Sequence, residues 1–134
     1  DIVVKVMDFN TYRHIEQKLR LYMETVEKIK QQIAENPIIL YMKGSPKLPN
    51  CGFSSQASQA LMSCGEPFAY VDILLNPDIR AELPAYANWP TFPQLWVEGE
   101  LIGGCDIIIE MFQRGELQPL ITETAAKHKP ADAE

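Results

Sequence analysis

Short apolar runs mark four predicted strands along the chain. The run at 38–42 is rich in β-branched and aromatic residues and lies between a proline and a glycine, which is typical of a buried strand. A similar run at 68–73 predicts a second strand. Two more runs, at 94–97 and 101–102, are separated by Glu98-Gly99-Glu100, a turn sequence that predicts a β-hairpin.

Helical periodicity fills the segments between these runs. A first helix is predicted to begin with Thr25 as its N-cap and to end at Asn36, because the residue before a proline disfavours helical geometry. Further helices are predicted at 55–64, at 78–86, at 107–114 with Asp106 as N-cap, and from Leu117 to Ile121. The order strand, helix, strand implies a parallel, right-handed crossover. We therefore predict an α/β fold with a four-stranded mixed sheet flanked by α-helices.

The first 22 residues fit this pattern poorly. Residues 2–6 look like a strand, and a helical stripe follows them. The stripe consists of Ile15, Leu19 and Tyr22. Because Met23 is a candidate natural start, we expect residues 1–22 to be an extension of little functional weight, before a domain at 23–127 and a frayed tail at 128–134. The alternative is a native appendage that packs on the core.

Composition and charge narrow the classes of function. The chain is 46% hydrophobic and 22% charged, which fits one globular domain, and its net charge of -6 argues against general binding to nucleic acid or to anionic membranes. No apolar run is long enough to span a bilayer. Three cysteines make a secreted disulfide scaffold unlikely, and no signal peptide is recognisable, so a reducing cytoplasm is the expected compartment.

Cys51 lies where the first predicted strand gives way to a helix. The unpaired N–H groups and the dipole of a helix N-terminus favour negative charge, and Lys43 and Lys47 add positive charge nearby. We predict that Cys51 is a partly exposed, reactive thiolate, against the alternative of an ordinary small apolar residue. Cys64 is predicted to be buried and inert. Cys105 offers either its backbone to a ligand or its thiol as a resolving group for Cys51.

The sequence around Cys51 also resembles a known active site. Cys51-Gly52-Phe53-Ser54, preceded by Lys43-Gly44-Ser45-Pro46, is similar to the motif of the monothiol, CGFS-type glutaredoxins, in particular the bacterial glutaredoxin 4-like ones. The resemblance extends from about Met23 to about Lys127. It implies a thioredoxin-like fold, which agrees with the predicted order of strands and helices.

The resemblance implies a glutathione site built from separated motifs. Glutathione carries two carboxylates and an ammonium, so a site needs cations or helix N-termini, an acid, and a free backbone edge. Lys43 and Arg80 are candidates for the glycine carboxylate, and the backbone of Phe92 is a candidate for the central cysteine. The start of a helix at Gly104-Cys105-Asp106 offers N–H groups to the other carboxylate, and the Asp106 carboxylate offers an acceptor to the ammonium.

Each of these positions has a plainer interpretation. Arg80 is otherwise a solvated helix charge, and Asp106 is otherwise only an N-cap. An X-Pro bond is usually trans, but Thr91-Phe92-Pro93 resembles the family's threonine-x-cis-proline segment, which implies a cis bond at Pro93. Phe53 is as consistent with the core as with the site.

Ser54 separates this chain from dithiol redox proteins. A C-x-x-C enzyme resolves its mixed disulfide with a second cysteine at this position, which here is a hydroxyl. Three hypotheses for the function remain open. One is a glutathione-dependent oxidoreductase that removes glutathione from proteins with Cys51 as sole nucleophile. The second is iron–sulfur binding. The third is a thioredoxin-like interaction module without chemistry.

The family resemblance favours the iron–sulfur function. A [2Fe–2S] cluster takes four soft ligands, and one chain with one glutathione offers two. The resemblance implies a homodimer that holds one cluster with Cys51 of each chain and two glutathiones, and that passes it to acceptor proteins. It also implies a heterodimer with BolA-like proteins and, at most, weak oxidoreductase activity.

Overall fold

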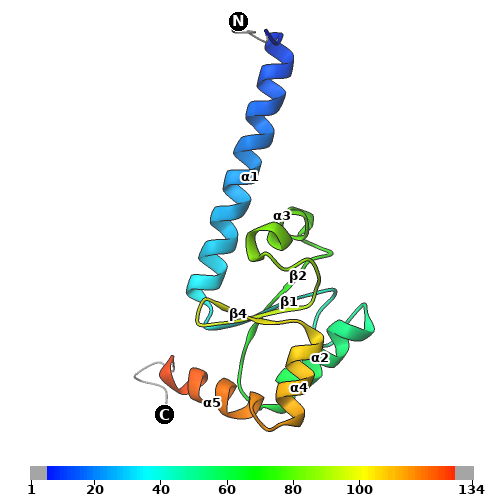
Figure 1. Ribbon diagram of the computed structural model, residues 1–134, viewed down its shortest axis with the longest axis vertical. Helices are drawn as coiled ribbons and strands as arrows, with labels where there is room; N and C mark the ends of the chain where they lie inside the picture. The colour runs from blue at the N-terminus through cyan, green and yellow to red at the C-terminus, as the bar shows by residue number, and fades with distance from the viewer. Residues whose placement is uncertain (1–5, 129–134) are drawn as a thin grey trace, which may run out of the picture.

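The computed structural model describes residues 6–128. Its elements, which Figure 1 shows, are α1 (Phe9–Glu35), β1 (Ile38–Met42), α2 (Gly52–Ser63), β2 (Ala69–Asp72), α3 (Pro77–Ala87), β3 (Gln94–Val97), β4 (Glu100–Gly103), α4 (Cys105–Gln113) and α5 (Leu117–Lys127). The strands form one sheet in the order β2-β1-β3-β4. β1 pairs parallel with β2 and antiparallel with β3, and β3 pairs antiparallel with β4. The predicted four-stranded mixed sheet is confirmed.

Helices cover both faces of this sheet. Because successive side chains of a strand point to opposite faces, β1 sends Leu40 to one core and Tyr41 to the other. The first core lies against α2, α4 and α5 and includes Leu61 and Ile108. The second core lies against α1 and α3 and includes Ile29. Every residue of β1 is buried, as its continuous apolar sequence predicts for a central strand.

The first helix is longer than predicted. It begins at Phe9, not after Thr25, and its N-cap is Asp8, whose carboxylate accepts the N–H of Thr11 at 2.7 Å. Thr25 is instead a buried residue in the middle of the helix. The physical reason is continuity, since no glycine or proline interrupts the sequence from Phe9 to Glu35. The predicted strand at 2–6 lies almost wholly outside the described residues, as does the tail from 129 onward.

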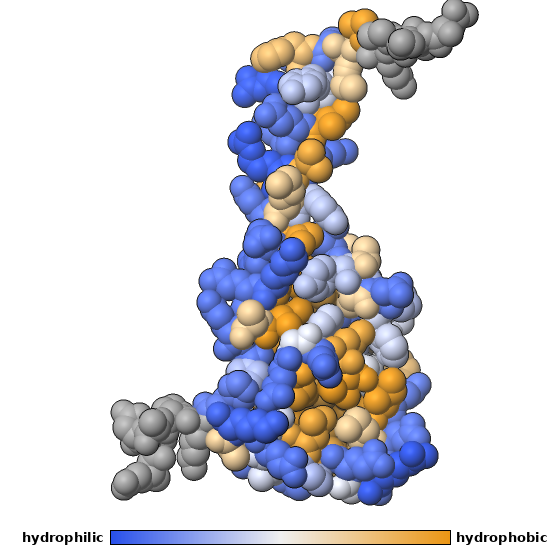
Figure 2. All heavy atoms as spheres, turned by 60° about the vertical axis from the view of Figure 1, so that its left-hand side comes forward, coloured by the Kyte–Doolittle hydropathy of each residue, from blue (hydrophilic) through white to orange (hydrophobic). Residues whose placement is uncertain are grey.

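The boundary predicted between residues 22 and 23 therefore falls inside α1. The half of α1 that precedes it projects away from the sheet (Figure 1) and carries apolar side chains on its surface (Figure 2). Exposed large apolar side chains on this half are Phe9, Tyr12, Ile15, Leu19, Leu21 and Tyr22. Within residues 6–128, no helix is long and apolar enough to cross a membrane.

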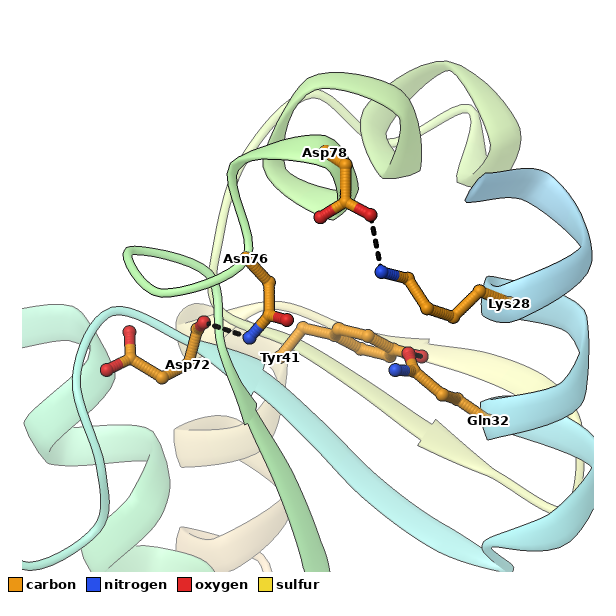
Figure 3. A network of polar contacts seen from close by, with 6 residues as sticks. All are labelled: Lys28, Gln32, Tyr41, Asp72, Asn76 and Asp78. Carbon is orange, nitrogen blue, oxygen red and sulfur yellow. Dashed lines mark hydrogen bonds and ion pairs between the residues drawn. The ribbon is translucent and has the colours of Figure 1, made fainter. Parts of the chain in front are cut away.

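Polar contacts fasten the second half of α1 to the domain (Figure 3). The Lys28 ammonium pairs with the Asp78 carboxylate at the start of α3, and the buried Tyr41 hydroxyl donates to Gln32 Oε1 at 2.9 Å. Burial raises the pKa of the Tyr41 hydroxyl, which therefore remains a donor. These contacts tie α1, β1 and α3 together, and so fix the helix that carries Arg80.

Two helix starts also differ from prediction. α2 begins at Gly52, directly after Cys51, and not at residue 55. α4 begins at Cys105 with Gly104 as its N-cap, whereas Asp106 lies in the first turn and is not the N-cap. Gly103, with a φ of 148°, turns the chain just before this helix, which starts two residues earlier than predicted.

Candidate functional site

Cys51 is the N-cap of α2, and its sulfur accepts the N–H of Ser54 at 3.3 Å. Burial alone would raise the pKa of this thiol. The Ser54 hydroxyl, then the N–H groups of Ser54 and Phe53, and last the positive charge of Lys43 outweigh that effect and lower the pKa below its ordinary value. A partly exposed cysteine with a lowered pKa is thus confirmed. The predicted contribution of Lys47 is not, because its side chain is not among the groups that lower this pKa.

Ser54 is fully buried beneath Cys51. Its hydroxyl oxygen accepts the backbone N–H of Lys43 at 3.0 Å, so the fourth residue of the motif joins α2 to the end of β1. The position that holds a resolving thiol in C-x-x-C proteins therefore has a structural role here. Without a second thiol at this position, Cys51 has no resolving partner within its own motif.

The loop between β1 and Cys51 is compact. Asn50 donates its backbone N–H to the carbonyl of Lys43 at 3.0 Å, which closes the loop on itself. Gly44 has a φ of 88°, and a Cβ there would lie 2.4 Å from the carbonyl oxygen of Leu48. Its N–H donates to Asp72 Oδ1 at 2.9 Å. We call residues 43–54, this loop with the start of α2, the thiol wall.

A second wall of the cleft is formed by two segments of the chain that lie close together in space. The Phe92–Pro93 peptide bond is cis, as the family resemblance implies, and Phe92 lies beside the start of α4 in the lining of the cleft. Gly104 approaches this segment so closely that a Cβ would lie 3.2 Å from the carbonyl oxygen of Pro93. We call residues 89–93 and 103–106 the backbone wall.

Between the two walls lies a cleft of about 570 Å³. Its lining contains all five residues predicted to contact glutathione: Lys43, Arg80, Phe92, Cys105 and Asp106. Cys51 is not part of the lining, but its neighbour Phe53 is, with a side chain 62% exposed. Within residues 6–128, neither Lys43 nor Arg80 forms an ion pair, so both charges are available to a ligand. The sequence motifs, far apart in the chain, thus meet at one cleft.

The other two cysteines differ from Cys51. Burial raises the pKa of Cys64, whose thiol donates to the Ala60 carbonyl at 3.5 Å. Burial, then the charges of Asp106 and of Cys51, raise the pKa of Cys105, whose sulfur lies 3.6 Å from Gln56 Oε1. Both are therefore neutral thiols at pH 7, and Cys51 is the one of the three cysteines whose pKa is lowered.

Sequence reasoning missed part of this cleft. Trp89 lines it, and the indole Nε1 of Trp89 is buried without a hydrogen-bond partner. Pro84 and Ile107 also line it. One signal for Trp89 was available, because it directly precedes Pro90 and Thr91. A tryptophan is equally consistent with a buried core position, however, so its residue type did not predict a place in the cleft lining.

The described part of the chain contains no complete metal site. Among residues 6–128, no group of three or more histidine, cysteine or acidic side chains is arranged to hold a metal ion.

Comparison with known proteins agrees with this geometry. A family model described as glutaredoxin matches residues 38–102. Glutaredoxin 4 of Escherichia coli (strain K12) is 82% identical over 105 residues, which cover 78% of this chain and 91% of the relative.

Solved structures of glutaredoxins share the fold. Reduced poplar apo GrxS14 superimposes with a TM-score of 0.64 at 40% identity, covering 75% of this chain and 92% of that one. The holo form of glutaredoxin C1 from Populus tremula x tremuloides gives 0.70 at 25% identity, covering 80% and 95%. A buckwheat glutaredoxin–glutathione complex gives 0.69 at 24% identity, covering 80% and 96%.

The fold is therefore thioredoxin-like, and the cis bond before Pro93 agrees with what the family resemblance implies. With Ser54 in place of a second active-site cysteine, the chain belongs to the glutaredoxin family, among the monothiol proteins related to bacterial glutaredoxin 4.

Proposed function

We propose that this monothiol glutaredoxin binds glutathione in the cleft and uses it, with Cys51, to carry a [2Fe–2S] cluster to acceptor proteins. The observation that carries the proposal is a single thiol of lowered pKa beside a cleft with two unpaired cations. Iron–sulfur clusters are held by thiolates, and glutathione supplies a second one at the same place.

The charges of the cleft suit the ends of glutathione. Lys43 and Arg80 would hold the glycine carboxylate, and the N–H groups at the start of α4 would hold the γ-glutamyl carboxylate. The carboxylate of Asp106 would accept the ammonium beside it. The backbone of Phe92 would pair with the central cysteine, in the manner of an added strand.

The donor set fits a cluster only when two chains meet. One chain offers Cys51, and the raised pKa values of Cys64 and Cys105 disfavour both as further ligands. Two copies of Cys51 and two glutathione thiolates complete a set of four. A homodimer in the cluster-bound form follows from this count, and we propose BolA-like proteins as heterodimer partners. We propose the cytoplasm as the compartment, since free thiolates need reducing conditions.

The alternative function is glutathione-dependent removal of glutathione from protein mixed disulfides. The lowered pKa of Cys51 favours it as well, because the thiolate is the attacking form. In this cycle Cys51 attacks the glutathione sulfur of the mixed disulfide and releases the protein thiol. A second glutathione then attacks the Cys51 mixed disulfide, releasing oxidised glutathione and the Cys51 thiolate.

Anaerobic cluster reconstitution with and without glutathione separates the two functions. The cluster function predicts visible absorption and a dimer only when glutathione is present. Absence of colour, together with steady glutathione-dependent reduction of mixed disulfides, would favour the oxidoreductase.

We also propose that residues 23–127 suffice for this function. The half of α1 before Met23 adds no residue to the cleft. A chain starting at Met23 should reconstitute to the same absorbance per chain as the full chain, and a lower absorbance would assign a role to the extension.

A further inference from the structure

Gln94, the first residue of β3, is a fully buried polar side chain directly behind the cleft. Its Nε2 donates to the carbonyl oxygens of Trp89 at 3.0 Å and of Thr91 at 3.3 Å. Its Oε1 accepts the indole N–H of Trp96 at 3.1 Å. Glutamine is seldom fully buried, and here the amide oxygen and nitrogen both have partners.

Trp96 determines which way this amide points. An indole N–H is a donor only, so it requires the Gln94 oxygen and leaves the amide nitrogen to face the loop. Trp96 is itself buried, 8% exposed, in the core beneath α1 and α3. The orientation of the amide is therefore set from the core side of the sheet.

The two carbonyls held by Gln94 belong to the backbone wall. Residues 89–93 form neither helix nor strand, so no ladder of hydrogen bonds fixes them. Outside the Gln94 contacts, the backbone N–H of Trp89 donates to the Pro84 carbonyl at 3.0 Å. Gln94 itself is not part of the cleft lining.

We propose that Gln94 is a positioning residue for glutathione recognition. It holds the Trp89 and Thr91 carbonyls, and so presents the backbone of Phe92 to the ligand already in its binding geometry. Binding then spends no free energy on ordering this segment. This inference rests on the glutathione site proposed above. Trp96 takes part by fixing the amide, one step further from the ligand.

The test removes the hydrogen bonds from Gln94 to the Trp89 and Thr91 carbonyls with a substitution of nearly equal volume. Gln94→Leu removes both donors, and we expect glutathione affinity to fall about tenfold, which corresponds to about 1.4 kcal/mol. Trp96→Phe retains an aromatic ring but removes the indole N–H that orients the Gln94 amide. It should weaken glutathione affinity about two- to threefold. Gln113→Leu is the matched control, because Gln113 is exposed at the end of α4, and should bind like wild type.

A second readout separates positioning from general loss of structure. Cys51 lies on the thiol wall, so its rate of alkylation by iodoacetamide should be unchanged in Gln94→Leu and Trp96→Phe. Weaker glutathione binding with unchanged alkylation supports the proposal. Wild-type affinity in Gln94→Leu overturns it, and so does a parallel loss of alkylation in Trp96→Phe, which would mean that the whole site had loosened.

NMR backbone relaxation of residues 88–92 tests, without any ligand, whether the Gln94 hydrogen bonds order this segment. Increased mobility of this segment in Gln94→Leu supports an ordering role for Gln94, and unchanged mobility overturns it. If Gln94→Leu fails to fold, Trp96→Phe is measured in its place. If the wild-type protein fails to bind glutathione, the proposed function and the recognition role of Gln94 fall together. The relaxation result then still decides whether Gln94 orders the wall.

Discussion

The thiol wall and the backbone wall face the same cleft but are built differently. The thiol wall owes its chemistry to a side chain, Cys51, whose charge is stabilised by N–H groups of its own helix turn. The backbone wall presents main-chain groups, held by contacts from β3 such as those of Gln94. The charge of Cys51 therefore depends mainly on contacts within its own helix turn, whereas the backbone wall consists of two segments, 89–93 and 103–106, that the fold brings together at Gly104 and Pro93. Substitutions on the thiol wall should change reactivity, and those on the backbone wall should change binding and stability.

The largest expected effect is at Cys51. Cys51→Ser should abolish rapid alkylation at pH 7 and glutathione-dependent colour on cluster reconstitution, because no other thiol has a lowered pKa. Cys64→Ser is the control and should retain both properties. A Cys51→Ser protein that still holds a stable cluster would refute the assignment of the thiol wall.

Gly103→Ala should be the most damaging change tested on the backbone wall. The φ of 148° disfavours a side chain, and a Cβ would lie 2.5 Å from Ile107 Cδ1. We expect a loss of about 1–3 kcal/mol in the free energy of unfolding, measured by urea denaturation. Gly99→Ala is the control, since its φ of 80° is also positive but no atom lies within 4 Å. Equal losses in the two variants would show that the close approach at Ile107 carries no cost.

Ser54 links reactivity to structure within the thiol wall. Ser54→Ala removes the acceptor of the Lys43 N–H and should cost about 1 kcal/mol in urea denaturation without raising thiol–disulfide turnover. Ser54→Cys should show a similar cost but a gain in turnover, because it adds a resolving thiol beside Cys51. Unchanged turnover would mean that the loop, and not the missing thiol, limits the dithiol reaction.

The smallest expected effect is at Lys43. Its charge lowers the pKa of Cys51 less than the N–H groups do, so Lys43→Gln should raise that pKa slightly. The alkylation-versus-pH curve should shift to higher pH, and the rate at pH 7 should fall about two- to threefold, because a smaller fraction is thiolate. Lys47→Gln should leave the curve in place. An equal shift in both variants would indicate a diffuse field and not a specific contact.

Much of the fold was predictable because its signals are local. The strand at 38–42 and the hairpin at 94–102 were both found from their apolar runs and turn residues. The start of α1 was misplaced because Thr25 resembles an N-cap, although uninterrupted helical sequence continues back to Phe9. A capping residue is informative only where the chain before it cannot remain helical.

The same distinction applies to the site. Cys51 and Ser54 were recognisable from one short motif, and the cations from charge and family resemblance. The roles of Trp89 and Gln94 were not recognisable. The partners of Gln94 are only two to five residues away in sequence, but its contacts depend on the irregular path of residues 89–93, which no motif in the sequence predicts. The residue type of Gln94 predicts an exposed side chain, and no feature of the sequence around it predicts burial.

The length of α1 has a practical consequence. The half of α1 that precedes Met23 projects about 20 Å from the domain, whereas a compact chain of this size has a radius of gyration of about 14 Å. A particle with such a rod attached experiences more friction than a sphere of its 15.2 kDa mass. It will therefore elute early from a gel-filtration column even as a single copy. Light scattering measures molar mass independently of the shape of the particle. It is therefore the appropriate way to count chains in the cluster-bound form.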